Sequence, residues 1–344
     1  MRAISSVFML AALTSVVAAQ TASVDEFYKG KTITIVIGFS AGGDYDLRAR
    51  LLSRHMDRHI PGAPTILARN MPGAGGVSAT NWLATLAPRD GTSWLMASQN
   101  TPLIQALGTP GVEFDARQFN WLGNTTNSPN LISVWAGRGV ATIDDARKRV
   151  VAVGASGVGS GSYYYPYAAN VVGKTRFKIV TGYPGGNDIN IAMERGEVDG
   201  RGSNSFAAWK STRPHWIAEG KLIHLVQIAL KRHPELPDVP LLSDLATTDI
   251  DRQAMQLIAA ETAMARAVAA TADIPADRVA ALRKAFTATM RDKEFLGEAD
   301  RLGFDISPAT GEEVQEIVNS IVNAPGPVVQ RVKEILAPPS PAKP

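Results

Sequence analysis

Hydrophobic residues first gather in a short run, Ile33–Ile37, which leads within two residues into the polar and glycine-rich stretch Ser40-Ala-Gly-Gly43. An apolar run that ends in turn residues predicts a buried β-strand over 33–37. From residue 47 to residue 56, apolar side chains recur at helical spacing with arginines between them, which predicts a helix over 46–59. The turn between strand and helix leaves backbone N–H groups free at the positive end of the helix dipole. This loop is therefore a candidate anion site.

The alternation of apolar strand, polar turn and amphipathic helix continues along the chain and predicts an α/β fold with mainly parallel sheets flanked by helices. The unit of strand, glycine-rich loop and helix occurs near residue 38 and again near residue 154, which favours two α/β domains. The last hundred residues are expected to be largely helical, with helix starts at Pro275 and at the capping-box sequence Thr310–Glu313. Further strands are expected over 65–68, 93–97, 150–153, 177–181, 198–202 and 222–229, and further helices over 77–86 and 188–195.

Composition narrows the class of protein. The 344 residues include 45% hydrophobic and 19% charged residues with a net charge of +3, values that suit a packed globular protein of two domains. The charge balance is mild and no long run of Lys and Arg is present, so nucleic acid is not an expected partner. There are no cysteines, and therefore neither disulfides nor a lipid-modified N-terminal cysteine can form.

The N-terminal residues have the pattern of an export signal. Arg2 supplies the positive start, residues 4–18 the apolar stretch, and small residues allow cleavage near Ala19. We therefore expect a signal peptide over 1–19 and a periplasmic protein. No later segment has the ~20 apolar residues that a membrane span needs, and the Pro-rich residues 337–344 are expected to be a disordered tail.

Seven motifs, in order, resemble one family. They are Phe39-Ser-Ala-Gly-Gly-Asp-Tyr-Asp46, Asn70-Met-Pro-Gly-Ala-Gly-Gly76, Ala87-Pro-Arg-Asp-Gly91, Ala155-Ser-Gly-Val-Gly-Ser160, Tyr183-Pro-Gly-Gly186, Gly196-Glu-Val-Asp199 and Leu236-Pro-Asp-Val-Pro240. Over about 28–336 the chain is similar to the substrate-binding receptors of tripartite tricarboxylate transporters, the Bug or TctC-like receptors.

This resemblance implies a two-domain periplasmic binding protein of the Venus-flytrap, type II-like kind, with domain 1 formed by 24–125 plus 249–336 and domain 2 by 126–248. It implies a receptor that closes over a small organic acid and delivers it to the membrane permease subunits of a transporter, without enzymatic activity or cofactor. A di- or tricarboxylate, an aromatic acid and an acidic amino acid all remain open as ligands. Signalling to a membrane sensor kinase is the alternative function, and a secreted hydrolase is a third.

The expected ligand contacts come from both glycine-rich loops and from strand ends. In domain 1 the amides of 41–43 and the Ser40 hydroxyl would hold one carboxylate. In domain 2 the loop 154–161 has the spacing of a P-loop, but Ser160 stands where the phosphate-binding Lys is required, so a nucleotide is not expected. The candidate ligand-binding residues are Ser40, Ala41, Gly42, Gly43, Asp46, Asn100, Ser156, Gly157, Gly159, Ser160, Tyr183 and Asn204.

Several charged residues admit two interpretations. Asp46 matches an Asp of the family and would fix the loop, whereas Asp44 departs from the family pattern and either faces solvent or meets an ammonium group of the ligand. Arg201 is either a carboxylate clamp or a partner in a surface ion pair. His55 and His59 have a spacing found in zinc sites, but the surrounding pattern does not fit one, so no metal is expected.

The four tyrosines between 163 and 167 also admit two roles. They could form an aromatic wall for the ligand. Packing inside domain 2 is the other reading, and it suits most of them.

Overall fold

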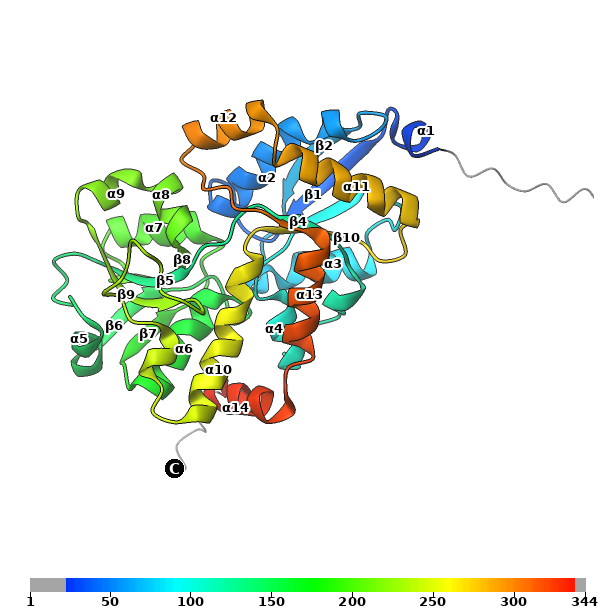
Figure 1. Cartoon of the computed structure of the whole chain (residues 1–344). Helices are drawn as coiled ribbons and strands as arrows, with labels where there is room; N and C mark the ends of the chain where they lie inside the picture. The colour runs from blue at the N-terminus through cyan, green and yellow to red at the C-terminus, as the bar shows by residue number, and fades with distance from the viewer. Residues whose placement is uncertain (1–22, 338–344) are drawn as a thin grey trace, which may run out of the picture.

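The computed structural model describes residues 23–337 and divides them into two lobes, each built on one β-sheet (Figure 1). The predicted signal peptide lies outside the described residues, as does the predicted tail beyond Ala337. Within 23–337, no helix is both long enough and apolar enough to cross a bilayer.

The sheet of the first lobe has the strand order β11-β4-β10-β3-β1-β2. Side chains alternate between its two faces because successive residues of a strand point in opposite directions. Ile35 and Ile37 therefore pack with α2, α11 and α12, while Val36 between them packs with α3, α4 and α13. The elements of this lobe are β1 (Thr32–Ile37), β2 (Thr65–Asn70), β3 (Ser93–Met96), β4 (Asn120–Asn124), β10 (Ala267–Ala270), β11 (Ala309–Thr310), α1 (Val24–Tyr28), α2 (Asp44–His55), α3 (Val77–Thr85), α4 (Thr101–Ala106), α11 (Ala276–Thr289), α12 (Lys293–Arg301) and α13 (Gly311–Val322).

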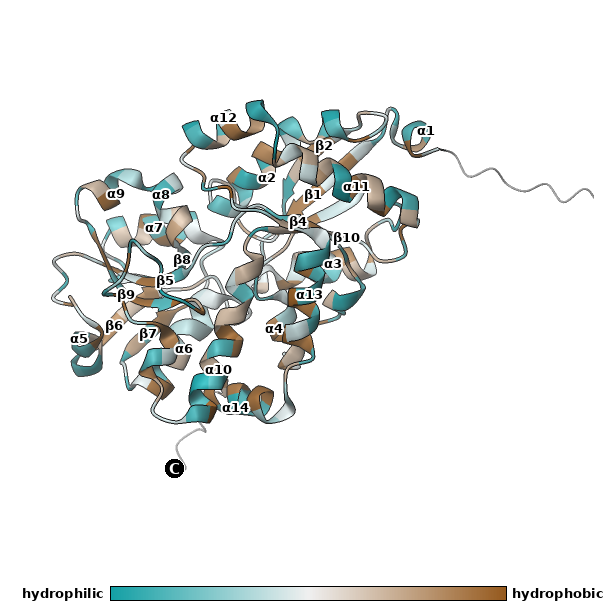
Figure 2. Ribbon diagram, in the orientation of Figure 1, coloured by the Kyte–Doolittle hydropathy of each residue, from teal (hydrophilic) through white to brown (hydrophobic). Residues whose placement is uncertain are grey.

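The sheet of the second lobe has the order β7-β6-β8-β5-β9. One face packs against α6, α10 and α14, and the other against α7, α8 and α9. The ribbons of α12 and α14 show hydrophilic and hydrophobic residues in turn, as expected for helices with one buried face (Figure 2). The elements are β5 (Asn130–Trp135), β6 (Val151–Gly154), β7 (Phe177–Val180), β8 (Gly200–Ser205), β9 (Leu222–Ile228), α5 (Ile143–Lys148), α6 (Gly161–Gly173), α7 (Gly186–Glu194), α8 (Phe206–Thr212), α9 (Pro214–Ala218), α10 (Asp249–Ala260) and α14 (Gly326–Leu336).

The predicted α/β fold class is confirmed, but the sheets are mixed rather than mainly parallel. Strand β1 is parallel to β2 and β3, and β6 is parallel to β7 and β8. The antiparallel pairs involve β4, β5 and β10, which lie where the chain passes from one lobe to the other, together with β8, β9, β11 and β3 beside them. A strand that enters a sheet from the neighbouring lobe need not follow the direction set by local strand–helix–strand units.

The C-terminal part of the chain contributes to both lobes. Helix α13 packs on β4 and α4 of the first lobe, whereas α14 packs on α10 and α6 of the second. Both α10 and α14 fall in the range 249–336 that the resemblance assigned to domain 1. Their apolar faces nevertheless complete the core of the second sheet, with Met255 and Val332 fully buried there.

A close approach between α6 and β8 gives a first testable prediction. A Cβ atom at Gly202 would lie 2.0 Å from the Ser162 carbonyl oxygen, so Gly202→Ala must push the helix away from the strand. We expect a loss of roughly 1–3 kcal/mol in the free energy of unfolding, measured by urea denaturation. Gly326→Ala is the control, because a Cβ there meets nothing within 4 Å. Equal stability of the two variants would contradict the close packing.

Candidate functional site

A cleft between the two lobes receives residues from both glycine-rich loops. Gly43 and Asp44 at the start of α2 line it from the first lobe, and Ser160 and Gly161 at the start of α6 line it from the second. The first amides of a helix have no acceptor within the helix, and they carry its positive dipole end. The cleft holds ≈70 Å³, room for roughly five water molecules, so its ligand is small.

The lobes touch each other around this cleft. The Ser40 hydroxyl donates to Asp188 Oδ2 at 2.6 Å, and the Asn100 amide donates to the Gly159 carbonyl. Gln99 Nε2 donates to the Tyr165 hydroxyl at 2.9 Å. These bonds join residues more than fifty positions apart across the two lobes, so the structure is in a closed arrangement.

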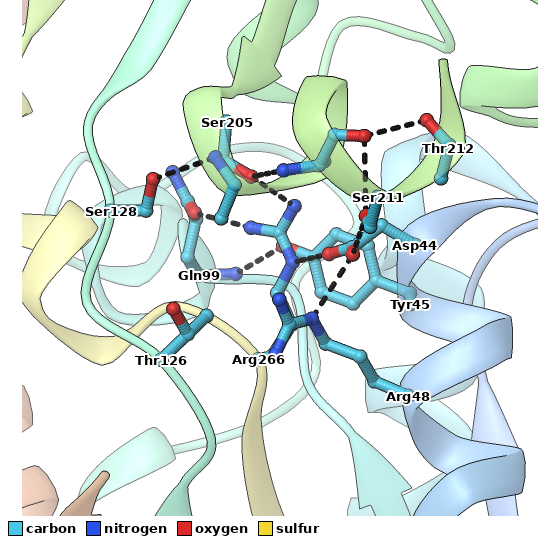
Figure 3. Close-up of polar contacts among 12 residues, drawn as sticks. Asp44, Tyr45, Arg48, Gln99, Thr126, Ser128, Ser205, Ser211, Thr212 and Arg266 are labelled. Carbon is cyan, nitrogen blue, oxygen red and sulfur yellow. Dashed lines mark hydrogen bonds and ion pairs between the residues drawn. The ribbon is translucent and has the colours of Figure 1, made fainter. Parts of the chain in front are cut away.

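Asp44 is buried and lies between two arginines (Figure 3). Its Oδ1 accepts from Arg48 Nε at 3.0 Å, and its Oδ2 accepts from Arg266 Nε at 2.5 Å. Burial alone would raise the pKa of Asp44, but the two guanidinium groups outweigh it and lower the pKa to about 2. Asp44 therefore neither faces solvent nor awaits an ammonium group, because its charge is already balanced within the protein.

Arg201 on β8 lines the cleft from the second lobe, and no carboxylate of residues 23–337 lies within ion-pair distance of it. Its Nη1 donates to the Gly186 carbonyl at 3.2 Å and to Asn190 Oδ1 at 3.0 Å, and its guanidinium lies 5.6 Å from the Trp209 ring centre. Burial, with the charge of Arg266 nearby, lowers the pKa of Arg201 to about 9, so it remains a cation at neutral pH.

Four buried donors of the second lobe have no hydrogen-bond partner among the described residues, namely Trp216 Nε1 and three donors at the cleft. The three at the cleft are Arg201 Nε and the side-chain amide nitrogens of Asn130 and Asn204. All three residues line the cleft. A buried donor without a partner costs free energy, and its presence at a cleft indicates that something else accepts the hydrogen bond.

Behind the cleft lies a second buried acid, Glu261, in the turn between α10 and β10. It accepts from the hydroxyls of Tyr164 and Tyr165 and, at 3.4 Å, from Gln99 Nε2. Burial raises the pKa of Glu261 to about 7, although these hydrogen bonds favour its charged form. Tyr164 and Tyr165 thus pack inside the second lobe and hold this acid, and none of the predicted tyrosine wall lines the cleft.

The two histidines of the zinc-like spacing belong to an ion-pair network that joins α2 and the following turn to α12. His59 Nε2 lies 2.8 Å from Asp292 Oδ2, and His55 Nε2 lies 2.5 Å from Glu298 Oε2. One nitrogen or oxygen atom from each of His55, Asp292 and Glu294 lies within 4.8 Å of the other two, a spacing that could suit a metal ion. Arg58, however, pairs with Glu294 and contacts His55. Arg58 therefore supplies a positive charge beside the carboxylates of Asp292 and Glu294.

Comparisons with known proteins agree on the architecture. No family model matches the chain. A protein of Cupriavidus necator described as "UPF0065 protein in gbd 5'region" is 25% identical over 248 residues, which cover 69% of this chain and 71% of that protein.

Solved structures match nearly the whole chain. The periplasmic binding protein BugD aligns with a TM-score of 0.69 at 20% identity, covering 90% of this chain and 98% of BugD. An R. palustris protein with adipate aligns with a TM-score of 0.68 at 19% identity, covering 89% and 97%. MatC from Rhodopseudomonas palustris with bound malate gives a TM-score of 0.66 at 21% identity, covering 89% and 99%. In fold, this chain is similar to the periplasmic binding protein BugD.

Half of the predicted contact residues line the interlobe cleft. The glycine-rich loop of the first lobe contributes less than expected, because the Ser40 hydroxyl is bonded to Asp188 instead of facing the cleft. The residues that line the cleft are Gly42, Gly43, Asn100, Ser156, Ser160 and Asn204.

The other six predicted residues do not line the cleft. Asp46 fixes the loop by accepting from the Gly42 amide at 2.9 Å and from Arg50 and Asn70. A Cβ at Gly159 would lie 2.6 Å from the Ala74 carbonyl oxygen, so this loop approaches the first lobe closely. The residues outside the lining are Ser40, Ala41, Asp46, Gly157, Gly159 and Tyr183.

Three residues that line the cleft, Asn130, Arg201 and Arg266, were not among the candidate contacts selected from the sequence. Of these, only Arg201 had a signal in the sequence: it was one possible carboxylate clamp, and it opens a polar run, Arg201–Ser205, at the end of the strand predicted over 198–202. Arg266 follows the amphipathic helix α10 and lies 222 positions after Asp44, so its place in the cleft depends on the tertiary fold.

Proposed function

We propose that this protein is a periplasmic solute-binding receptor that captures a small organic acid in the interlobe cleft and delivers it to the membrane permease subunits of a tripartite tricarboxylate-type transporter. The observation that carries the proposal is the cation Arg201, which lines the cleft beside two unpartnered amide donors and has no carboxylate partner in the described chain. A carboxylate supplies both the missing charge and the missing acceptors.

The energetics agree with such a ligand. Hydrogen bonds to a charged group contribute ~1.5–3 kcal/mol each, and the bidentate geometry of an arginine with a carboxylate adds specificity. Micromolar affinity corresponds to ~8 kcal/mol. Arg201, the two asparagine amides and the helix start at Ser160 together can supply a net free energy of this size.

The relatives support the same class of ligand and location. Two structures of similar fold hold adipate and malate, and BugD is described as a periplasmic binding protein. We extend the periplasmic location to this chain, with cleavage of the signal peptide near Ala19. The seven ordered motifs extend membership of the Bug receptors to it as well.

A thermal-shift panel of organic acids, preceded by mass spectrometry of gently purified protein, tests the proposal. An acid at a hundred times its Kd should stabilise the native state by ~2.7 kcal/mol and raise the Tm. The bound molecule should be recovered chemically unchanged. If the protein carries no acid and no acid of the panel shifts the Tm, the proposed function is wrong; recovery of a cleaved product would indicate a hydrolase.

Delivery to a permease is a separate part of the proposal. Vesicles containing the permease subunits should take up the identified acid only when this receptor is added. Uptake that is independent of the receptor would contradict it.

A further inference from the structure

The residues that line the cleft carry a small net charge, which is distributed unevenly between the two lobes. The charged residues that line the cleft are Asp44, Arg201 and Arg266, so the described lining carries a net charge of +1. Arg201 lies on the second lobe, whereas Asp44 and Arg266 lie on the first. The number of negative charges that the cleft can hold depends on which of the two arginines is free.

Arg266 is not free. Its Nε is bonded to Asp44 Oδ2, its Nη2 donates to Ser205 Oγ at 3.0 Å, and its guanidinium lies 4.5 Å from the Tyr45 ring centre. Burial works against the charge of Arg266, but the Asp44 carboxylate beside it raises its pKa. The first lobe therefore presents an ion pair to the cleft, with no cation left over.

Arg48, Asp46 and Asp188, behind the lining, leave no unpaired cation there. Arg48, the other partner of Asp44, donates to the Asp305 backbone carbonyl at 3.0 Å, and the Asp305 side chain supplies a second negative charge near it. Asp46 is bonded to Arg50, and Asp188 to Ser40. Arg48 and Arg50 thus have acids beside them before a ligand arrives, whereas the partner of Asp188 is an uncharged hydroxyl.

Two remaining charged residues lie outside the cleft lining. Arg213 donates to Asn187 and to a backbone carbonyl, and it does not itself line the cleft. Glu261 lies behind the tyrosine hydroxyls. Arg201 remains as the cation that the ligand meets directly.

We propose that Asp44 sets the charge of the ligand, so that the cleft takes a monoanion whose single carboxylate binds Arg201 and whose opposite end is an uncharged hydrogen-bonding group. This inference rests on the proposed function. A second carboxylate would have to lose its water beside Asp44, and like charges in a buried site repel each other. The uncharged end meets the ion pair, Gln99 and Ser98, which offer both donors and acceptors.

Pairs of acids that differ only in charge test this inference on the unaltered protein. Succinate and its monoamide succinamate have nearly the same shape, as do adipate and adipamate. Calorimetry at neutral pH should show the monoamide of the better-fitting length binding at least about tenfold more tightly than its diacid. Equal or tighter binding of the diacid overturns the inference and leaves the proposed function standing, whereas absence of binding by every acid, in these pairs and in the panel, overturns the function itself.

Asp44→Asn frees Arg266 while keeping the size of the side chain. The ratio of diacid to monoamide affinity should then rise at least about tenfold. Asp44→Asn combined with Arg266→Gln restores the net charge of the lining and should return the preference to the monoamide. An unchanged ratio in Asp44→Asn contradicts the role of Asp44, and if that variant does not fold, the double variant and the isosteric pairs still decide the question.

Discussion

Replacing Arg201 by methionine should weaken binding of the captured acid at least about 100-fold. The change removes the one unmatched cation of the cleft lining, and with it two charge-assisted hydrogen bonds that together contribute about 3 kcal/mol or more. Methionine keeps an apolar stem to pack near Trp209, which lies under the guanidinium. Calorimetry with the acid identified by the panel measures the loss.

Stability separates a binding role of Arg201 from a structural one. No described carboxylate pairs with this side chain, and burial already opposes its charge, as the lowered pKa of about 9 shows. The ligand-free Tm of Arg201→Met should therefore be unchanged or higher. Arg201→Lys keeps the charge without the bidentate fork and should lose only about tenfold in affinity. A variant with full affinity and a lower Tm would show that Arg201 only holds the fold.

Stability of the protein should fall as the pH rises from about 4.5 to about 7. The cause is Glu261, whose carboxyl has a pKa raised by burial to about 7, against 4.5 when it is exposed. A raised pKa means that the folded state holds the proton over this range while the unfolded state does not, so the stabilisation is complete below pH 4.5 and lost by pH 7. The expected loss from this group is about 3 kcal/mol, measured by urea unfolding at a series of pH values.

Glu261→Gln should remove this part of the pH dependence. A glutamine amide accepts from one tyrosine hydroxyl and donates to the other, so the buried contacts with Tyr164 and Tyr165 can be kept. Glu316→Gln, at an exposed position of α13, is the matched control and should follow the wild-type curve. A Glu261→Gln curve as steep as the wild-type curve would mean that Glu261 is charged in the folded state throughout.

Much of the fold follows from local pattern. The strand over 33–37, the glycine turn after it and the capping box at Thr310 are encoded by neighbouring residues, and each is found where the pattern predicts it. The direction of the strands next to the lobe crossings was not predictable in this way. Neither was the packing of α10 and α14 on the second lobe, because an apolar stripe on a helix does not specify which sheet it covers.

The candidate site likewise combines features that the local sequence predicts with features that only the tertiary fold determines. The glycine-rich loops were recognisable because turn chemistry is local, and both reach the cleft. The charges that decide what the cleft holds come from pairs far apart in the chain, such as Asp44 with Arg266, 222 positions away. A sequence shows that Asp44 is an unusual residue in its loop, but only the fold shows which cation neutralises it.

The C-terminal helices limit how the lobes can separate. The chain passes between the lobes after β4 and before β10, and it passes a third time between α13 and α14, at residues 323–325. Two connections alone would form a hinge and permit a large rotation of one lobe relative to the other. The third connection, residues 323–325, links α14, which packs on α10, to α13 of the first lobe. We therefore expect the lobes to separate by a short sliding motion along α10 and α13, and the length of this connection to limit how far the cleft opens.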